Sequence, residues 1–266
     1  MSAKHLCRRS YFGKTPNCSG DGAEPSKIQD LTLLAVGSTS ARLITCVPMR
    51  LLSDLRSEHN LIEKVIGSLH TFAMERARGE GDPADGSAFL RFFRLYAGRF
   101  HHAREEDSLF PALVEHTEAP ANRGPIPALR SQHHAIAAIL DVAEPLLVAA
   151  RLDTAAGRRL RDLCARHAAA LLHHIDAENS VLLPESETRF RRAGLGELAN
   201  RAPDAEEDAA RADGERLVAT YAPSALPNVL RGEGCASCDA FGDTCQGIER
   251  EWWSELEWED VLDRIG

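Results

Sequence analysis

The chain has 266 residues, 44% of them hydrophobic, which is enough to bury one large core or one domain with extensions. Its formal net charge of −9 argues against a nucleic acid as partner, because affinity for a phosphate backbone depends on clustered Lys and Arg. The sequence has neither a run of roughly 20 apolar residues that could cross a bilayer nor the pattern of a signal peptide, so we expect a cytoplasmic protein without a membrane partner.

Residues 1–48 contain Gly, Ser, Pro and Thr without a sustained period, which predicts an irregular N-terminal extension. This segment is either an addition from an early start codon or a functional tail. From Met49 onward the pattern becomes helical, with apolar residues on one face at spacings of three and four. The first such stripe consists of Leu52, Leu55, His59, Ile62, Ile66 and Leu69.

Three more helical runs are predicted, over residues 87–116, 128–151 and 155–184. The segments GEGDPADGS, TEAPANRGPIP and RLDTAAG interrupt the pattern with Gly or Pro, as is typical of loops. Four helices joined by short loops predict an all-α protein, an antiparallel up-down four-helix bundle over residues 49–190. The stripes of the last two helices consist of Leu129, His133, Ile136, Leu140, Ala143 and Leu147, and of Leu160, Leu163, His167, Leu171, His174, Glu178 and Val181.

An internal repeat lies within this region. His101, Glu105 and Pro111 recur 73 positions later as His174, Glu178 and Pro184, and each unit follows a helix with its own histidine on the apolar stripe. A histidine and a glutamate four residues apart lie on the same side of a helix, so both units point into the bundle.

Two buried carboxylates would repel each other unless a cation lay between them. Imidazole and carboxylate donors without thiolate suit iron or manganese, which predicts a di-metal carboxylate site. The predicted ligands are His59, His101, Glu105, His133, His174 and Glu178.

Adjacent histidines leave an alternative open, because His102 and Glu106 are also four residues apart. The repeat offset favours His101 and Glu105. On the third helix the apolar stripe runs through His133 and not through His134.

The order of SEHNLI, HHAREEDSLFP, RSQHHAI and HHIDAENSVLLP resembles the hemerythrin-like, or HHE cation-binding, domain family over about residues 50–185. The resemblance implies a non-haem di-iron centre bridged by the two glutamates and an oxo or hydroxo group. Members bind O2, respond to nitric oxide or peroxide, or handle iron. The oxygen carriers have two histidines four apart on the third helix, whereas Leu129 and Ala137 stand four residues from His133 here. The candidates for a fifth histidine are His102, His70 and His167.

The expected function is therefore a reaction with O2, NO or peroxide, in redox or gas sensing or a stress response. The alternatives are an oxidative di-iron enzyme that acts on a small molecule, and a binding protein for iron or oxygen. The partner in the first case is a diatomic or peroxide ligand.

Residues 191–266 predict a C-terminal extension with a short helix near residues 204–220. Its cysteines, Cys235, Cys238 and Cys245, could hold a second metal, form a redox pair or remain reduced. The segment EREWWSELEWED predicts an amphipathic helix. Its tryptophans, Trp252, Trp253 and Trp258, would dock on the bundle itself or on a protein partner.

Overall fold

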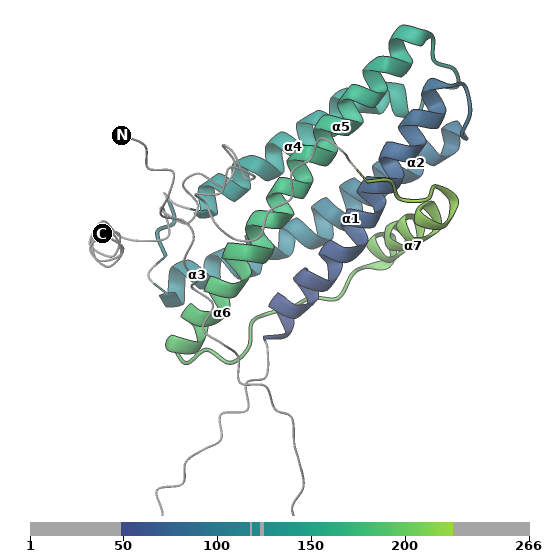
Figure 1. Cartoon of the computed structure of the whole chain (residues 1–266). Helices are drawn as coiled ribbons and strands as arrows, with labels where there is room; N and C mark the ends of the chain where they lie inside the picture. The colour runs from purple at the N-terminus through teal and green to yellow at the C-terminus, as the bar shows by residue number, and fades with distance from the viewer. Residues whose placement is uncertain (1–48, 118, 123–124, 226–266) are drawn as a thin grey trace, which may run out of the picture. The chain divides into compact units, whose positions relative to one another are not determined.

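The computed structural model describes residues 49–117, 119–122 and 125–225, and every regular element in these ranges is a helix (Figure 1). The predicted N-terminal extension, the three late cysteines and the tryptophan helix lie outside the described residues. Within the described part of the chain, no helix is both long enough and apolar enough to span a membrane.

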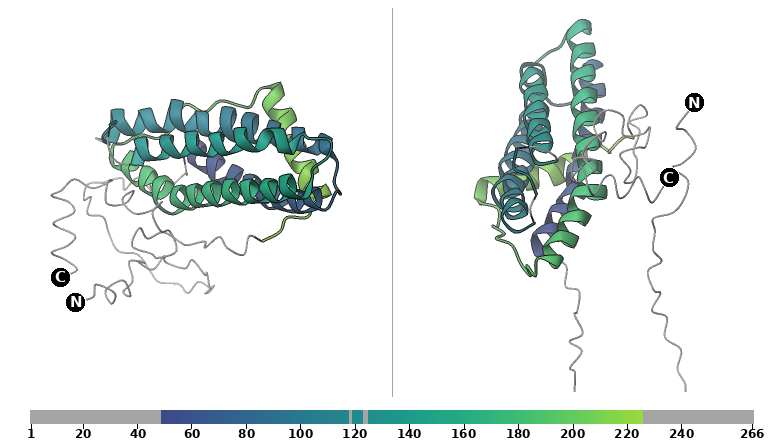
Figure 2. Two further views of the ribbon diagram at one scale, coloured as in Figure 1. Left: turned by 90° about the horizontal axis from the view of Figure 1, so that it is seen from above. Right: turned by 90° about the vertical axis from the view of Figure 1, so that its left-hand side faces the viewer.

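Four helical runs make up the bundle and lie side by side in the two views of Figure 2. The first run is α1 (Arg50–Ala77) and the third is α4 (Pro125–Leu147), and both pack along α5 of the fourth run. The second run consists of α2 (Pro83–Arg91), η1 (Phe92–His102), η2 (Glu105–Leu109) and α3 (Phe110–Thr117). The fourth run consists of α5 (Thr154–Ala177), η3 (Glu178–Leu182) and α6 (Leu183–Arg192). All members of the predicted apolar stripes of α1, α4 and the fourth run are buried.

The buried apolar side chains form two separate clusters. One includes Phe72, Phe89 and Leu160, and the other includes Phe110 and Phe190. Along each run, the predicted metal ligands fall between members of the two clusters. In α1, His59 lies between Leu55 and Ile62, and in α4, His133 lies between Leu129 and Ile136. A polar layer therefore divides the core into two apolar halves.

The fourth run was predicted to end at Pro184, but it continues to Arg192, and the second run continues past Pro111 to Thr117, close to its predicted end. Pro111 and Pro184 lie inside α3 and α6. Just before them, η2 and η3 are π-helical segments, in which the N–H of Phe110 donates to Glu105 O and the N–H of Leu183 donates to Glu178 O. These bonds span five residues, and the wider turn accommodates a proline that has no N–H to donate.

The start of the second run also differs from the prediction. The segment GEGDPADGS was expected to be a loop, but α2 begins inside it at Pro83. The side chain of Asp82 accepts a hydrogen bond from the N–H of Ala84, and Pro83 occupies the first helical position, where a missing N–H costs nothing. Asp82 and Pro83 together therefore initiate the helix earlier than its apolar stripe indicates.

A fifth helix, α7 (Ala205–Thr220), lies beyond residue 190, the predicted limit of the bundle. Asp204 caps it, and the Glu207 side chain accepts the Asp204 N–H in return, which forms a capping box. The helix packs against α1, α2 and η1 on the outside of the bundle (Figures 1 and 2). Leu217 and Ala210 are buried in the same cluster as Phe72 and Phe89. Part of the predicted C-terminal extension therefore completes the core.

The contact between α7 and η1 depends on a glycine. A Cβ added at Gly214 would lie 2.4 Å from two ring atoms of Phe92, whose side chain is fully buried. Gly214→Ala would otherwise stabilise an exposed helix by about 1 kcal/mol. Because the Phe92 ring has no room to move, we expect the substitution to lower the free energy of unfolding by about 1–3 kcal/mol, measured by urea denaturation. Gly196→Ala is the control, since an added Cβ there has no neighbour within 4 Å. Stability of Gly214→Ala equal to or above that of the unmodified chain would contradict this account of the α7 packing.

Candidate metal centre

The polar layer brings all six predicted ligands together. His59 comes from α1, His101 from η1 and His133 from α4, and each is buried. His174 comes from the last turn of α5, and the glutamates stand at the first residues of η2 and η3. Neither Glu105 nor Glu178 has exposed surface. The four runs thus direct their polar side chains to one level of the core.

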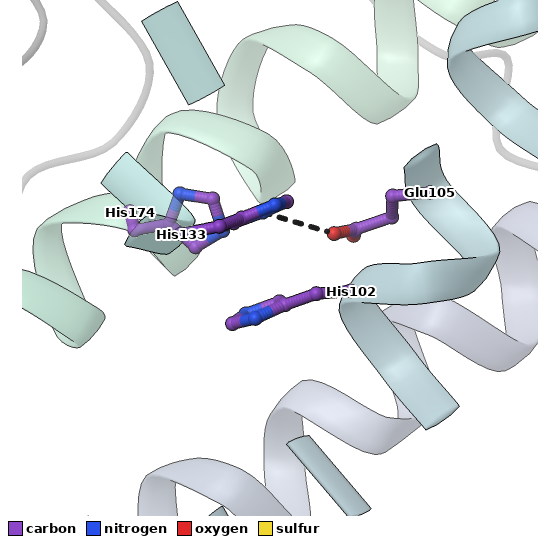
Figure 3. A group of neighbouring side chains, drawn as sticks. All are labelled: His102, Glu105, His133 and His174. Atoms are coloured by element: carbon purple, nitrogen blue, oxygen red, sulfur yellow. Dashed lines mark hydrogen bonds and ion pairs between the residues drawn. The ribbon is translucent and has the colours of Figure 1, made fainter. Parts of the chain in front are cut away.

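The ligand atoms form two groups, and within each group they all lie within 4.8 Å of one another. Figure 3 shows the second group, in which the imidazoles from two other helices face the glutamate of η2. Glu105 belongs to both groups. The first group consists of His59, His101, Glu105 and Glu178, and the second consists of His102, Glu105, His133 and His174.

Each glutamate directs its two oxygens to different histidines. Glu105 Oε1 lies 3.5 Å from His101 Nε2, and its Oε2 lies 3.4 Å from His133 Nε2. Glu178 Oε2 lies 3.2 Å from His59 Nε2, and its Oε1 lies 3.2 Å from His174 Nε2. Each carboxylate therefore faces a histidine of both groups, which is the arrangement that a bridging carboxylate requires.

The buried donor atoms lack the partners that a metal ion would provide. None of the four carboxylate oxygens makes a hydrogen bond within the described residues. His59 Nε2 and His101 Nε2 face each other at 3.0 Å, and His133 Nε2 and His174 Nε2 do so at 3.1 Å. Buried polar atoms normally have partners, and two imidazole lone pairs at this distance repel unless a proton or a cation lies beside them. The donor set therefore fits two metal ions.

The outer nitrogen of each of these four histidines is held by a side chain from another helix. The Nδ1–H of His59 donates to Asn179 Oδ1 at 2.8 Å, and that of His101 donates to Glu58 Oε2 at 2.8 Å. The other two bonds run from His133 Nδ1 to Glu106 Oε1 at 2.6 Å and from His174 Nδ1 to Gln132 Oε1 at 2.9 Å. Such bonds fix the ring orientation and leave the Nε2 lone pair for a metal.

The sequence analysis missed three of these four acceptors as functional residues and considered the fourth, Glu106, only as a ligand, although the repeat carries a signal for them. Each is adjacent in sequence to a predicted ligand, and Glu106 recurs as Asn179 at the same offset of 73 that relates the ligand pairs. Glu58 and Gln132 stand directly before His59 and His133. Glu106, which the alternative reading made a ligand, lies in neither group and instead accepts the hydrogen bond of His133.

His102 is the member of the second group that the repeat does not predict. It is buried, its Nε2 has no hydrogen-bond partner among the described residues, and its ring stacks on that of His133 with centroids 4.0 Å apart. The other two candidates for a fifth histidine lie elsewhere: His70 pairs with Ser224, and His167 packs edge-on against Phe93. Of the three candidates, only His102 stands within a metal-sized group.

The electrostatics of the layer favour positive charge beside the carboxylates. Burial by itself lowers the pKa of His133, but the carboxylates of Glu105 and Glu178 and the bond to Glu106 raise it to about 9. The pKa of His59 is raised in the same way, against its burial, by Glu178 and Glu105. Burial would raise the pKa of Glu178, yet His174 and His59 hold it well below the usual value. The layer thus keeps the Glu178 carboxylate ionised and attracts either protons on the imidazoles of His59 and His133 or a cation.

His102 has the opposite tendency. Burial, followed by the charges of His133, His174 and His101, lowers its pKa well below the ordinary value. A neutral imidazole is the form that binds a metal.

The sequence model of the hemerythrin HHE cation-binding domain matches residues 50–186. Comparison with curated proteins and with solved structures gave no match. The matched range covers about half of the chain and holds all seven residues of the two groups. The chain therefore belongs to the hemerythrin HHE cation-binding domain family.

Proposed function

We propose that the protein is a non-haem di-iron protein that reacts with O2, NO or peroxide, in redox or gas sensing or a stress response. The proposal rests on the placement of Glu105 and Glu178. In each glutamate, one carboxylate oxygen faces a histidine of the first group and the other faces a histidine of the second group. Mixed imidazole and carboxylate donors without thiolate suit iron. The four helical runs would supply these donors as an antiparallel up-down bundle.

The two metal positions would differ in their protein ligands. The first has two imidazoles, from His59 and His101, and the second has three, from His102, His133 and His174. Glu105 and Glu178 would be shared between them. A position with fewer protein donors retains coordination sites for a small exogenous molecule, which supports reactivity over iron storage. Bound iron would supply the redox change and the open coordination sites.

The surrounding side chains would tune this site. Glu58 and Glu106 place carboxylates against the outer nitrogens of His101 and His133. Such negative charge strengthens the imidazoles as donors and favours the more highly charged state of a metal. Arg104 donates to Glu58 and partly offsets its charge. Full burial of Glu105 and Glu178 keeps bulk water away from their carboxylates.

The two bridging candidates give the first test. After anaerobic reconstitution with Fe(II), we expect about two iron ions per chain, measured by elemental analysis. Glu105→Gln and Glu178→Gln keep the side-chain shape but replace a charged donor by a weak one, so each should lose most of the iron. Glu115→Ala, an exposed glutamate of α3, is the control and should keep full iron content. Wild-type iron content in both Gln variants would refute the assignment of the glutamates.

A second test asks whether His102 is a metal ligand. Because His102 belongs to only one group, His102→Ala should lower the iron content toward about one ion per chain. His134→Ala is the matched control, since His134 is exposed and adjoins His133. Retention of both ions with wild-type affinity in His102→Ala would show that His102 is not a ligand.

A third test addresses the reaction itself. The Fe(II)-reconstituted protein should change its near-ultraviolet absorption after separate exposure to O2, NO and H2O2, and Glu105→Gln should show no such change because it lacks the paired site. An absorption band that appears with O2 and disappears on deoxygenation would indicate an oxygen carrier. Continuous consumption of peroxide would indicate an enzyme. A slow, single conversion would indicate sensing. No spectral response to any of the three molecules would overturn the proposed function.

A further inference from the structure

A pocket of about 240 Å³ lies beside the second metal position, between η1 and α4. His102 and His133, seen in Figure 3, form part of its wall. His167 and Leu171 of α5 also line it. The pocket therefore gives access from the protein surface to one side of the candidate metal centre.

Small side chains create this space. Ala97 and Gly98 of η1 line it on one side, and Ala137 of α4 lines it on the other. A Cβ added at Gly98 would meet only one atom within 4 Å, the Phe93 carbonyl oxygen at 3.4 Å, so the space beside it is open. Ala137 is exposed and stands at the mouth.

The walls of the pocket are mostly flat rings and branched aliphatic chains. Its rings are those of Phe93, His102, His133 and His167, and Ile136, Leu140 and Leu171 add aliphatic surface. Aromatic rings pack best against other rings, by their faces or edges. The lining is therefore suited to an aromatic molecule.

Two polar atoms of the residues in this wall have no hydrogen-bond partner among the described residues: His102 Nε2, which the second metal position would use, and His167 Nδ1. His167 is buried, and its Nδ1 makes no hydrogen bond within the described residues. Burial lowers the pKa of His167 to about 4, so the ring is neutral near pH 7. Buried polar atoms normally have a hydrogen-bond partner, and a ligand hydroxyl would provide one.

The mouth of the pocket disfavours anions. Arg94 is bound to Asp141 and Glu144, each at 2.7 Å. Arg99 is bound to three more carboxylates, those of Asp204, Glu206 and Glu207. Both arginines that line the pocket are therefore already paired with carboxylates. Their neutralised charge favours a neutral ligand over an anion.

The pocket is larger than a diatomic molecule or hydrogen peroxide requires. An apolar cavity of about 150 Å³ holds one benzene molecule. A pocket of about 240 Å³ accommodates a six-membered ring with a substituent.

We propose that this pocket binds a small neutral phenol, with its ring among the four aromatic side chains and its hydroxyl paired with His167. The position of this ligand beside a reactive metal rests on the proposed function. Binding itself depends only on the protein walls, so it can be measured whether or not iron is present.

The test is calorimetric titration of the iron-reconstituted protein with phenol, with iron content measured on the same sample. Phenol should bind with a sub-millimolar Kd. Ala137→Phe places a ring across the mouth and should weaken binding about tenfold or more. Ala138→Phe, at the next and equally exposed position outside the pocket, should leave Kd within about twofold. Equal phenol affinity in the two Phe variants, or no phenol binding by the wild type, would overturn the proposal.

Toluene tests the role of His167. Wild-type protein should prefer phenol to toluene by about fivefold or more, and His167→Phe, which keeps the ring but lacks the nitrogen, should lose this preference. If His167→Phe still preferred phenol to toluene by the same factor, the phenol hydroxyl would not pair with His167. Full iron content without phenol binding would refute the pocket proposal alone, whereas phenol binding without iron would refute the di-iron proposal alone.

Discussion

Glu105 and Glu178 share a layer with five histidines between two apolar halves of the core, and this buried charge constrains everything around it. A buried carboxylate without compensation costs several kcal/mol, whereas a whole domain is stable by only about 5–15 kcal/mol. Two such groups could not be kept unless positive charge faced them. The facing imidazoles and a bound cation are the means by which the fold can retain them, so metal binding and folding are expected to be coupled.

How far the sequence could predict this centre depended on whether a feature is local to one helix. The spacing of His101 to Glu105 and the apolar stripe around His133 follow from the helical period alone, and the structure places those residues as the stripes indicate. The acceptors for the outer nitrogens could not be found in this way, because each bond joins two helices and depends on their packing. Glu58 of α1, for example, holds His101 of η1.

The same distinction between local and long-range features explains where the fold differs from the sequence prediction. The π-helical turns at Glu105 and Glu178 change the hydrogen bonding of the helix over a few residues, which the hydrophobic period does not report. The position of α7 depends on the close fit of Gly214 against Phe92, a contact between residues far apart in the chain. The helix itself was predicted near residues 204–220, and its start has a local signal, since Asp204 and Glu207 form a capping box.

The repeat is broken at one place, and the break accounts for the difference between the two groups of ligand atoms. The offset of 73 maps His102 onto Ile175, which is buried in the apolar core, so the third imidazole of the second group has no equivalent in the first. On α4, Ala137 leaves open the space four residues from His133, and that space is part of the pocket. The third imidazole of the second group therefore comes from His102 of η1. It does not come from α4, where Ala137 stands four residues from His133. As a result, the second group has three imidazoles against two in the first, and it also adjoins a cavity large enough for an organic molecule.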